Sequence, residues 1–198
     1  MKVIGLCGGS GSGKSTIASI FRDCGAEILD ADAIYHEITS YMSDCLISLR
    51  DTFGDAIILN DALNRKALRT IVFEGENARS DLKKLNEITH KYVREEMCRR
   101  IMFYRQQGVE LVLLDVPLLF ESDIDKICDY LICVTAPLEI RIDRLLERDG
   151  ITRESAMARI QSQHTDEYLI EHTHFHIIND KTLSDAEKQV KEIIKKIR

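Results

Sequence analysis

One stretch near the N-terminus constrains the fold of this chain more than any other, "GLCGGSGSGKST" at residues 5–16. It includes the end of a short apolar run at residues 3–7, and apolar residues at helical spacing follow it over 15–24. We therefore expect a buried strand, a glycine-rich loop and a helix in that order. Such a unit is typical of an α/β domain with a parallel sheet.

The loop fits the pattern G-x-x-x-x-G-K-[ST] at every fixed position, from Gly8 to Ser15. Glycine allows left-handed backbone angles and close approach, so the loop can aim several N–H groups at one phosphate chain. The helix N-terminus and Lys14 add positive charge, and the Ser15 hydroxyl is placed to coordinate Mg²⁺. A flexible glycine turn is the alternative, which the strand–helix context disfavours. The residues predicted to bind ATP here are Gly11, Ser12, Gly13, Lys14, Ser15 and Thr16.

Four further apolar runs predict strands, at residues 27–29, 111–116, 130–135 and 175–178. Helical patterns separate them, which favours an α/β fold with a five-stranded parallel sheet. Two intervals are longer than one crossover helix needs. The predicted parts are a helical insertion at about 33–107, a helical segment at about 138–171, and a core at about 1–32, 108–137 and 172–198.

Carboxylates end two of the predicted strands. Asp30 and Asp32 follow the second strand, at the sheet edge where ligands of open parallel sheets bind. One of them could accept a proton from an attacking hydroxyl, or both could cap the next helix; the spacing leaves both readings open. Asp115 ends the run "LVLLD", an arrangement that supports Mg²⁺ in P-loop proteins and also occurs at ordinary buried strand ends.

Three arginines, Arg141, Arg144 and Arg148, follow the fourth predicted strand. Arg144 and Arg148 are four residues apart and share a helical face. Arginines at such a place could neutralise the charge of a transferred phosphoryl group. A solvated face paired with Glu147 and Asp149 is the alternative, and for arginines in general it is the favoured one.

Composition narrows the partners of the chain. Its 198 residues carry a net charge of −6, which disfavours general binding to nucleic acids or acidic membranes. Six scattered cysteines without a C-x-x-C pair indicate neither a zinc module nor a disulfide scaffold. With no signal peptide and no long apolar run, we expect a cytoplasmic protein, a monomer or weak homo-oligomer.

The run "HTHFH" places His172, His174 and His176 two residues apart. On a strand they would share one face, as metal ligands can. No cysteine or carboxylate lies at a matching short spacing, so half-exposed polar residues before the last strand are the favoured interpretation.

Four stretches, "GGSGSGKST", "ILDAD", "DVPLLFE" at 115–121 and "RLLERDGIT" at 144–152, resemble the dephospho-coenzyme A kinase family. The resemblance extends over essentially all of residues 1–198. It implies a P-loop kinase fold in which the insertion is a coenzyme A subdomain and the segment at 138–171 is a mobile lid. It also implies transfer of the ATP γ-phosphoryl group to the ribose 3′-hydroxyl of dephospho-coenzyme A, with Mg²⁺ as cofactor.

The same resemblance implies residue roles. Asp32 matches the general base, Lys14 the phosphate cradle, and Arg144 a lid arginine that reaches the phosphates. Further implied contacts are Arg148 and Asn179 to ATP; Asp32, Arg65, His90, Leu118 and Glu121 to dephospho-coenzyme A; and Ser15 and Asp115 to the metal.

The chain departs from the family pattern at three places. Lys91 follows His90 where the family usually has proline, Leu169 replaces a lysine, and His174 replaces an aspartate. Contacts from the last two positions are not carried over. A kinase for another small hydroxylated metabolite or nucleoside, or an ATP-binding regulatory protein, remains the alternative.

Overall fold

The computed structural model describes residues 1–198, which divide into two compact units, residues 1–29 with 101–198 and residues 30–100. No helix in the chain combines the length and apolar character that crossing a bilayer requires.

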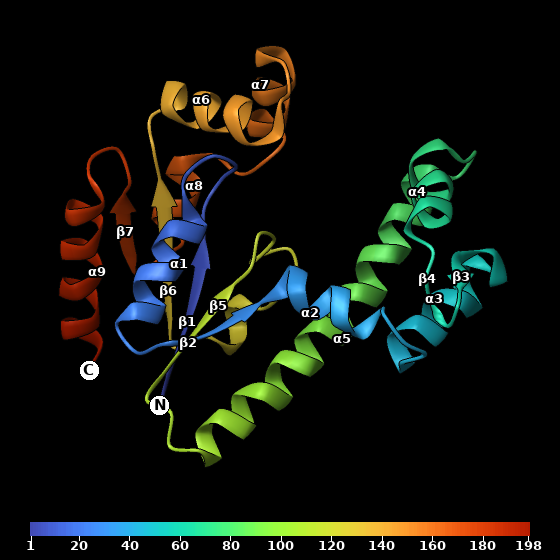
Figure 1. The fold of residues 1–198 in the computed structure, drawn as a ribbon, viewed down its shortest axis with the longest axis horizontal. Coiled ribbons are helices and arrows are strands. Elements are labelled where there is room, and N and C mark those ends of the chain that lie inside the picture. Colours follow the sequence, from blue (N-terminus) through green and yellow to red (C-terminus); the bar gives the residue numbers. More distant parts are fainter. The chain divides into compact units, whose positions relative to one another are not determined.

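The first unit contains a five-stranded parallel sheet, as the sequence predicts (Figure 1). The strand order is β2-β5-β1-β6-β7, so the two strands that flank β1 follow it much later in the sequence. All five predicted strands are confirmed, with boundaries that differ by one residue at most. Their bounds are β1 Lys2–Cys7, β2 Glu27–Asp30, β5 Leu111–Asp115, β6 Tyr130–Thr135 and β7 Phe175–Ile178.

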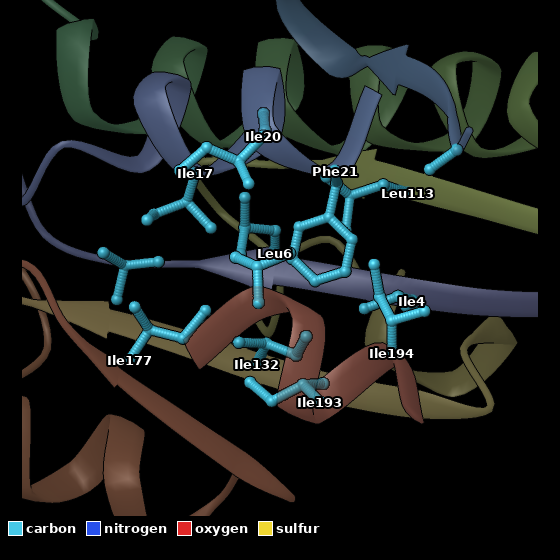
Figure 2. Close-up of a cluster of buried hydrophobic side chains, with 14 of the residues drawn as sticks. Ile4, Leu6, Ile17, Ile20, Phe21, Leu113, Ile132, Ile177, Ile193 and Ile194 are labelled. Carbon is cyan, nitrogen blue, oxygen red and sulfur yellow. The ribbon is translucent and has the colours of Figure 1, made fainter. Parts of the chain in front are cut away.

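Helices α1 (Lys14–Asp23) and α9 (Leu183–Ile197) lie side by side against the sheet (Figure 1). Both carry apolar residues at helical spacing, and those residues form the main core with β1, β5, β6 and β7. Figure 2 shows Phe21 of α1 and Ile194 of α9 in this cluster, together with Leu6 and Ile4 of β1. This core fixes the carboxyl end of β1, from which the glycine-rich loop leaves.

Three helices follow β6, with the bounds α6 Leu138–Asp149, α7 Arg153–Gln161 and α8 Asp166–Glu171. Helices α6 and α7 lie beyond the carboxyl end of β6 (Figure 1) and share a small core of Ile142, Leu145 and Ala156. A short 3₁₀ helix, η2 (Asp125–Ile127), precedes β6.

The second unit is mostly helical, with α2 (Ala31–Ile38), α3 (Asp44–Phe53), η1 (Asp55–Ile57), α4 (Arg65–Glu74) and most of α5 (Ala78–Gln106). It also contains a hairpin of β3 (Ile58–Leu59) and β4 (Ala62–Leu63), which the sequence analysis did not predict. Asn60 and Asp61 form its turn with φ of 52° and 59°, angles that these two residue types tolerate.

Candidate active site

The glycine-rich loop leaves β1 at the edge of the sheet where β5 and β6 also end. Leu6 is paired with Asp115 on one side and with Ile132 on the other. Gly13 is the N-cap of α1 with φ 86°, and a Cβ there would lie 2.0 Å from the Asn179 amide nitrogen. Glycine is therefore required at this cap, and the N-terminus of α1 offers backbone N–H donors of the kind that can bind a phosphate.

Lys14 and Asp115 form an ion pair, which joins the first turn of α1 to the end of β5. Asp115 is only 9% exposed, so its carboxylate lies inside the site rather than on the surface. The structure thus brings one predicted phosphate-binding residue to one predicted metal ligand.

The donor set at this place fits Mg²⁺. The Asp115 carboxylate and the Ser15 hydroxyl, in the first turn of α1, are oxygen ligands, which Mg²⁺ prefers. This ion usually keeps several waters and takes phosphate oxygens, so one or two protein ligands suffice.

Arg144 lies on the carbonyl side of the glycine-rich loop. Its Nη1 donates to the carbonyl oxygens of Gly11 and Ser12, each at 3.2 Å, and its Nη2 donates to the Asn179 carbonyl at 3.1 Å. The Asn179 side-chain amide also donates to the Ser12 carbonyl, at 2.9 Å. Two residues predicted to contact ATP, Arg144 and Asn179, therefore meet at the loop.

Arg141 also reaches the loop, which the sequence analysis missed by favouring a solvated face for these arginines. Its Nε donates to the Ser10 carbonyl at 2.9 Å, and its Nη1 pairs with Asp166 at 3.0 Å. One sequence feature could have indicated that Arg141 is buried. It lies among the apolar residues of α6, next to Ile142 and one turn before Leu145.

Arg148 lies at the end of the same helix. It is solvent-exposed and paired with a neighbouring carboxylate, which is the alternative considered for these arginines. Its guanidinium donates to the carboxylate of the adjacent Asp149 at 2.7 and 2.8 Å, and its side chain is 59% exposed. An ATP contact from Arg148 stays a prediction.

Asp30 and Asp32 have different local roles. The Asp30 side chain caps α2 by accepting from the Ala33 N–H at 3.0 Å, as the capping alternative expects. Asp32 does not lie on an extended chain but in the first turn of α2. The role of general base stays a prediction for Asp32.

The other predicted substrate residues of the second unit lie on α4 and α5. Arg65 begins α4, and His90 lies within α5. Burial raises the pKa of the Tyr35 phenol, and the positive charge of Arg65 partly offsets that rise. Next to His90, the Lys91 ammonium lies 4.9 Å from the centre of the Tyr92 ring.

The "PLLFE" stretch forms a turn after β5. The Leu118 carbonyl accepts from the N–H and the hydroxyl of Ser122, and Leu118 as a whole is 42% exposed. The exposed Glu121 carboxylate lies 3.3 Å from Nε2 of His164. Both residues are therefore accessible to a ligand.

The three histidines of "HTHFH" contact three separate partners. His172 stacks on Tyr168, Nδ1 of His174 accepts from a backbone N–H, and Nε2 of His176 lies 2.7 Å from the Thr135 hydroxyl. Burial lowers the pKa of His176. No group of three or more His, Cys, Asp or Glu residues in the chain is arranged to hold a metal ion. His172 and His174 are exposed and precede β7, whereas His176 is half-buried and lies within that strand.

The sequence and fold are similar to known kinases. A dephospho-CoA kinase from Bacillus thuringiensis subsp. konkukian is 37% identical over 195 residues, which cover 98% of this chain and 96% of the relative. A solved Thermus thermophilus protein, TT1252, superposes with a TM-score of 0.78 at 31% identity, covering 100% of this chain and 98% of that one. A dephospho-CoA kinase from Campylobacter jejuni gives a TM-score of 0.72 at 25% identity, covering 98% and 96%.

The family model for dephospho-CoA kinase matches residues 2–185, which include the glycine-rich loop, Asp115, both loop-binding arginines and Asn179. This chain therefore belongs to the dephospho-CoA kinase family.

Proposed function

We propose that this chain transfers the γ-phosphoryl group of ATP to the ribose 3′-hydroxyl of dephospho-coenzyme A, giving coenzyme A and ADP. This reaction is the last step of coenzyme A biosynthesis. The observation that carries the proposal is the family match over residues 2–185. The phosphate loop at the carboxyl edge of the sheet supports it, because a kinase of this fold binds its nucleotide there.

In the proposed mechanism, Asp32 orients the ribose hydroxyl and takes its proton while Lys14 neutralises charge on the moving phosphoryl group. Arg144 is proposed to assist Lys14. Its guanidinium donates to three backbone carbonyls through Nη1 and Nη2 in this structure, so Nε–H and the second Nη2–H are the donors that could reach a phosphate. A movement of the proposed lid, about residues 138–171, would exclude water from the site.

Ser15 and Asp115 are the residues proposed to hold Mg²⁺. When bound, the ion would supply positive charge that neutralises the phosphate chain of the nucleotide. Asp115 is paired with Lys14, so the same carboxylate can orient the lysine and serve the metal.

The remaining site residues are proposed to bind substrate. Arg65 and His90, in the proposed coenzyme A subdomain at about 33–107, supply positive charge or hydrogen bonds for the acceptor. Leu118 and Glu121 contact it from the turn after β5, and Arg148 and Asn179 contact ATP. We further propose that the protein is cytoplasmic and is a monomer or weak homo-oligomer.

A coupled assay of ADP release tests the reaction. It uses Mg-ATP with dephospho-coenzyme A, with adenosine, with a simple sugar, and without acceptor. ADP release that depends on dephospho-coenzyme A, with coenzyme A identified by mass, is the expected result. Equal release with every acceptor would overturn the substrate assignment, and slow hydrolysis unaffected by any acceptor would favour a regulatory ATP-binding protein.

A further inference from the structure

Arg141 is a buried cation that the proposed mechanism does not use. Its residue is only 5% exposed, whereas Arg148 on the same helix is largely in solvent. A buried guanidinium is retained only where charged or polar partners satisfy its donors. Two of those partners, the Ser10 carbonyl and the Asp166 carboxylate, lie in segments far apart along the chain.

The Arg141 guanidinium lies directly against the backbone of the phosphate loop. A Cβ placed on Gly9 would lie 2.2 Å from its Nη2, so no side chain could stand between them. The backbone of α6 also lies close to the loop, since a Cβ on Gly11 would lie 2.4 Å from the Arg141 carbonyl oxygen. The first turn of α6 thus packs directly against the loop from Gly9 to Gly11.

Ser10 is held on both of its backbone groups. Its carbonyl accepts from Arg141 Nε at 2.9 Å, and its N–H donates to Oε1 of Gln163 at 2.8 Å. Gln163 lies between α7 and α8, and Asp166 begins α8. Both loop contacts therefore depend on the same short segment, residues 163–166, and Arg141 connects that segment to the loop.

These contacts fix which way the loop peptides point. Arg141 binds the carbonyl of Ser10, and Arg144 binds those of Gly11 and Ser12. When a carbonyl accepts from a guanidinium, the N–H of the same peptide is polarised and becomes a better donor. The Ser12 N–H already donates to the Gly9 carbonyl at 3.0 Å, so the N–H groups of Gly11 and Gly13 are the ones prepared to donate toward a phosphate.

We propose that Arg141 is a positioning residue for nucleotide binding, and that the Asp166 carboxylate holds its guanidinium against the phosphate loop. The proposal rests on the proposed function only in that the loop binds the phosphates of ATP. Arg141 acts through the Ser10 carbonyl and does not touch the reacting groups. Lysine cannot replace it, because one ammonium cannot match the planar fork that reaches Ser10 and Asp166 together.

The test measures ATP and ADP dissociation constants by titration calorimetry without acceptor, and separately kcat and both KM values. The variants are Arg141→Lys, Arg141→Met and Asp166→Asn. Arg153→Met is the matched control, since Arg153 forms an exposed pair with Glu139 of α6. Thermal unfolding is recorded for each variant with and without ATP.

We expect Arg141→Lys to raise the dissociation constants of ATP and ADP by about tenfold, the cost of one charge-assisted bond. Asp166→Asn should raise them in the same direction but less, because the amide oxygen can still accept from Nη1. The KM for dephospho-coenzyme A should stay within about twofold, and Arg153→Met should match the wild type throughout.

A fall in melting temperature with unchanged nucleotide affinity would make Arg141 merely structural and overturn the proposal. If Arg141→Met fails to fold, Arg141→Lys and Asp166→Asn decide the matter. The outcome is also separable from the reaction assignment. If the wild-type chain binds ATP but does not phosphorylate dephospho-coenzyme A, the substrate assignment is overturned. The nucleotide affinities of the variants still test the role of Arg141. A wild-type chain that binds neither nucleotide would overturn both.

Discussion

The Lys14 ammonium and the Asp115 carboxylate are bound to each other across 101 residues of sequence, at the edge of the sheet where β1 and β5 end. The pair means that Lys14 is already oriented when the phosphates of a nucleotide arrive. It also means that Asp115 competes with those phosphates for the same ammonium. Replacing Asp115 should therefore weaken metal binding without weakening the binding of metal-free nucleotide.

Asp115→Asn should raise the Mg²⁺ concentration for half-maximal rate by about tenfold, because a neutral amide is a weaker ligand than a carboxylate. Affinity for ATP in EDTA should stay the same or improve, since Lys14 no longer has an anionic partner. Titrations of rate against Mg²⁺ and of metal-free ATP check the two effects. Glu110→Gln, an exposed site at the other end of β5, is the control. An unchanged Mg²⁺ dependence would remove Asp115 from the metal site.

Asp32→Asn should keep ATP affinity and lower kcat by about 10²- to 10⁴-fold, the usual contribution of a general base. Asp30→Asn is the matched control two residues away. Asparagine caps a helix as well as aspartate does, so α2 and the activity should both persist. Calorimetry measures the ATP affinity, and initial rates with dephospho-coenzyme A measure kcat. Comparable losses in both variants would assign the effect to α2 rather than to a base.

The sheet and the phosphate loop were predictable because their signals are local. Buried parallel strands are continuous apolar runs, and the glycine pattern fixes a strand–loop–helix unit. The hairpin of β3 and β4 was not predictable, since strands of two residues are too short to show an alternating pattern. Only its turn residues, Asn60 and Asp61, carried a signal.

Within the candidate site, residue types were predictable and partners were not. Lys14 and Asp115 were each assigned from local motifs, but their pairing depends on the register of β1 with β5. Arg141 was missed because a charge on a helix usually faces solvent. Its true environment comes from Ser10, 131 residues earlier, and from Asp166, 25 residues later.

Gly13→Ala should abolish measurable ATP binding and destabilise the protein by about 1–3 kcal/mol. The added Cβ meets the Asn179 amide at 2.0 Å, and the backbone has φ 86°. Gly25→Ala is the matched control, because Gly25 has φ 89° but nothing within 4 Å of an added Cβ. It should cost about 1–2 kcal/mol of backbone strain alone and leave ATP affinity intact. Denaturant unfolding measures the loss of stability, and calorimetry measures the loss of ATP affinity. Equal ATP affinities in both variants would show that the Asn179 side chain moves away from the added Cβ.

Two cysteine thiols, those of Cys7 and Cys128, make the free energy of unfolding depend on pH in the alkaline range. Burial raises the pKa of Cys7 and of Cys128 from 9.0 to about 12. Between pH 9 and 12 the unfolded thiols ionise while the folded ones stay neutral, so the unfolded state is favoured progressively. The free energy of unfolding should be independent of these thiols below pH 9 and should fall as the pH rises above it. Urea unfolding at pH 8 and pH 10.5 measures this fall, and Cys128→Ala should reduce it relative to the wild type. A pH dependence identical in Cys128→Ala and the wild type would show that the Cys128 thiol ionises equally in both states.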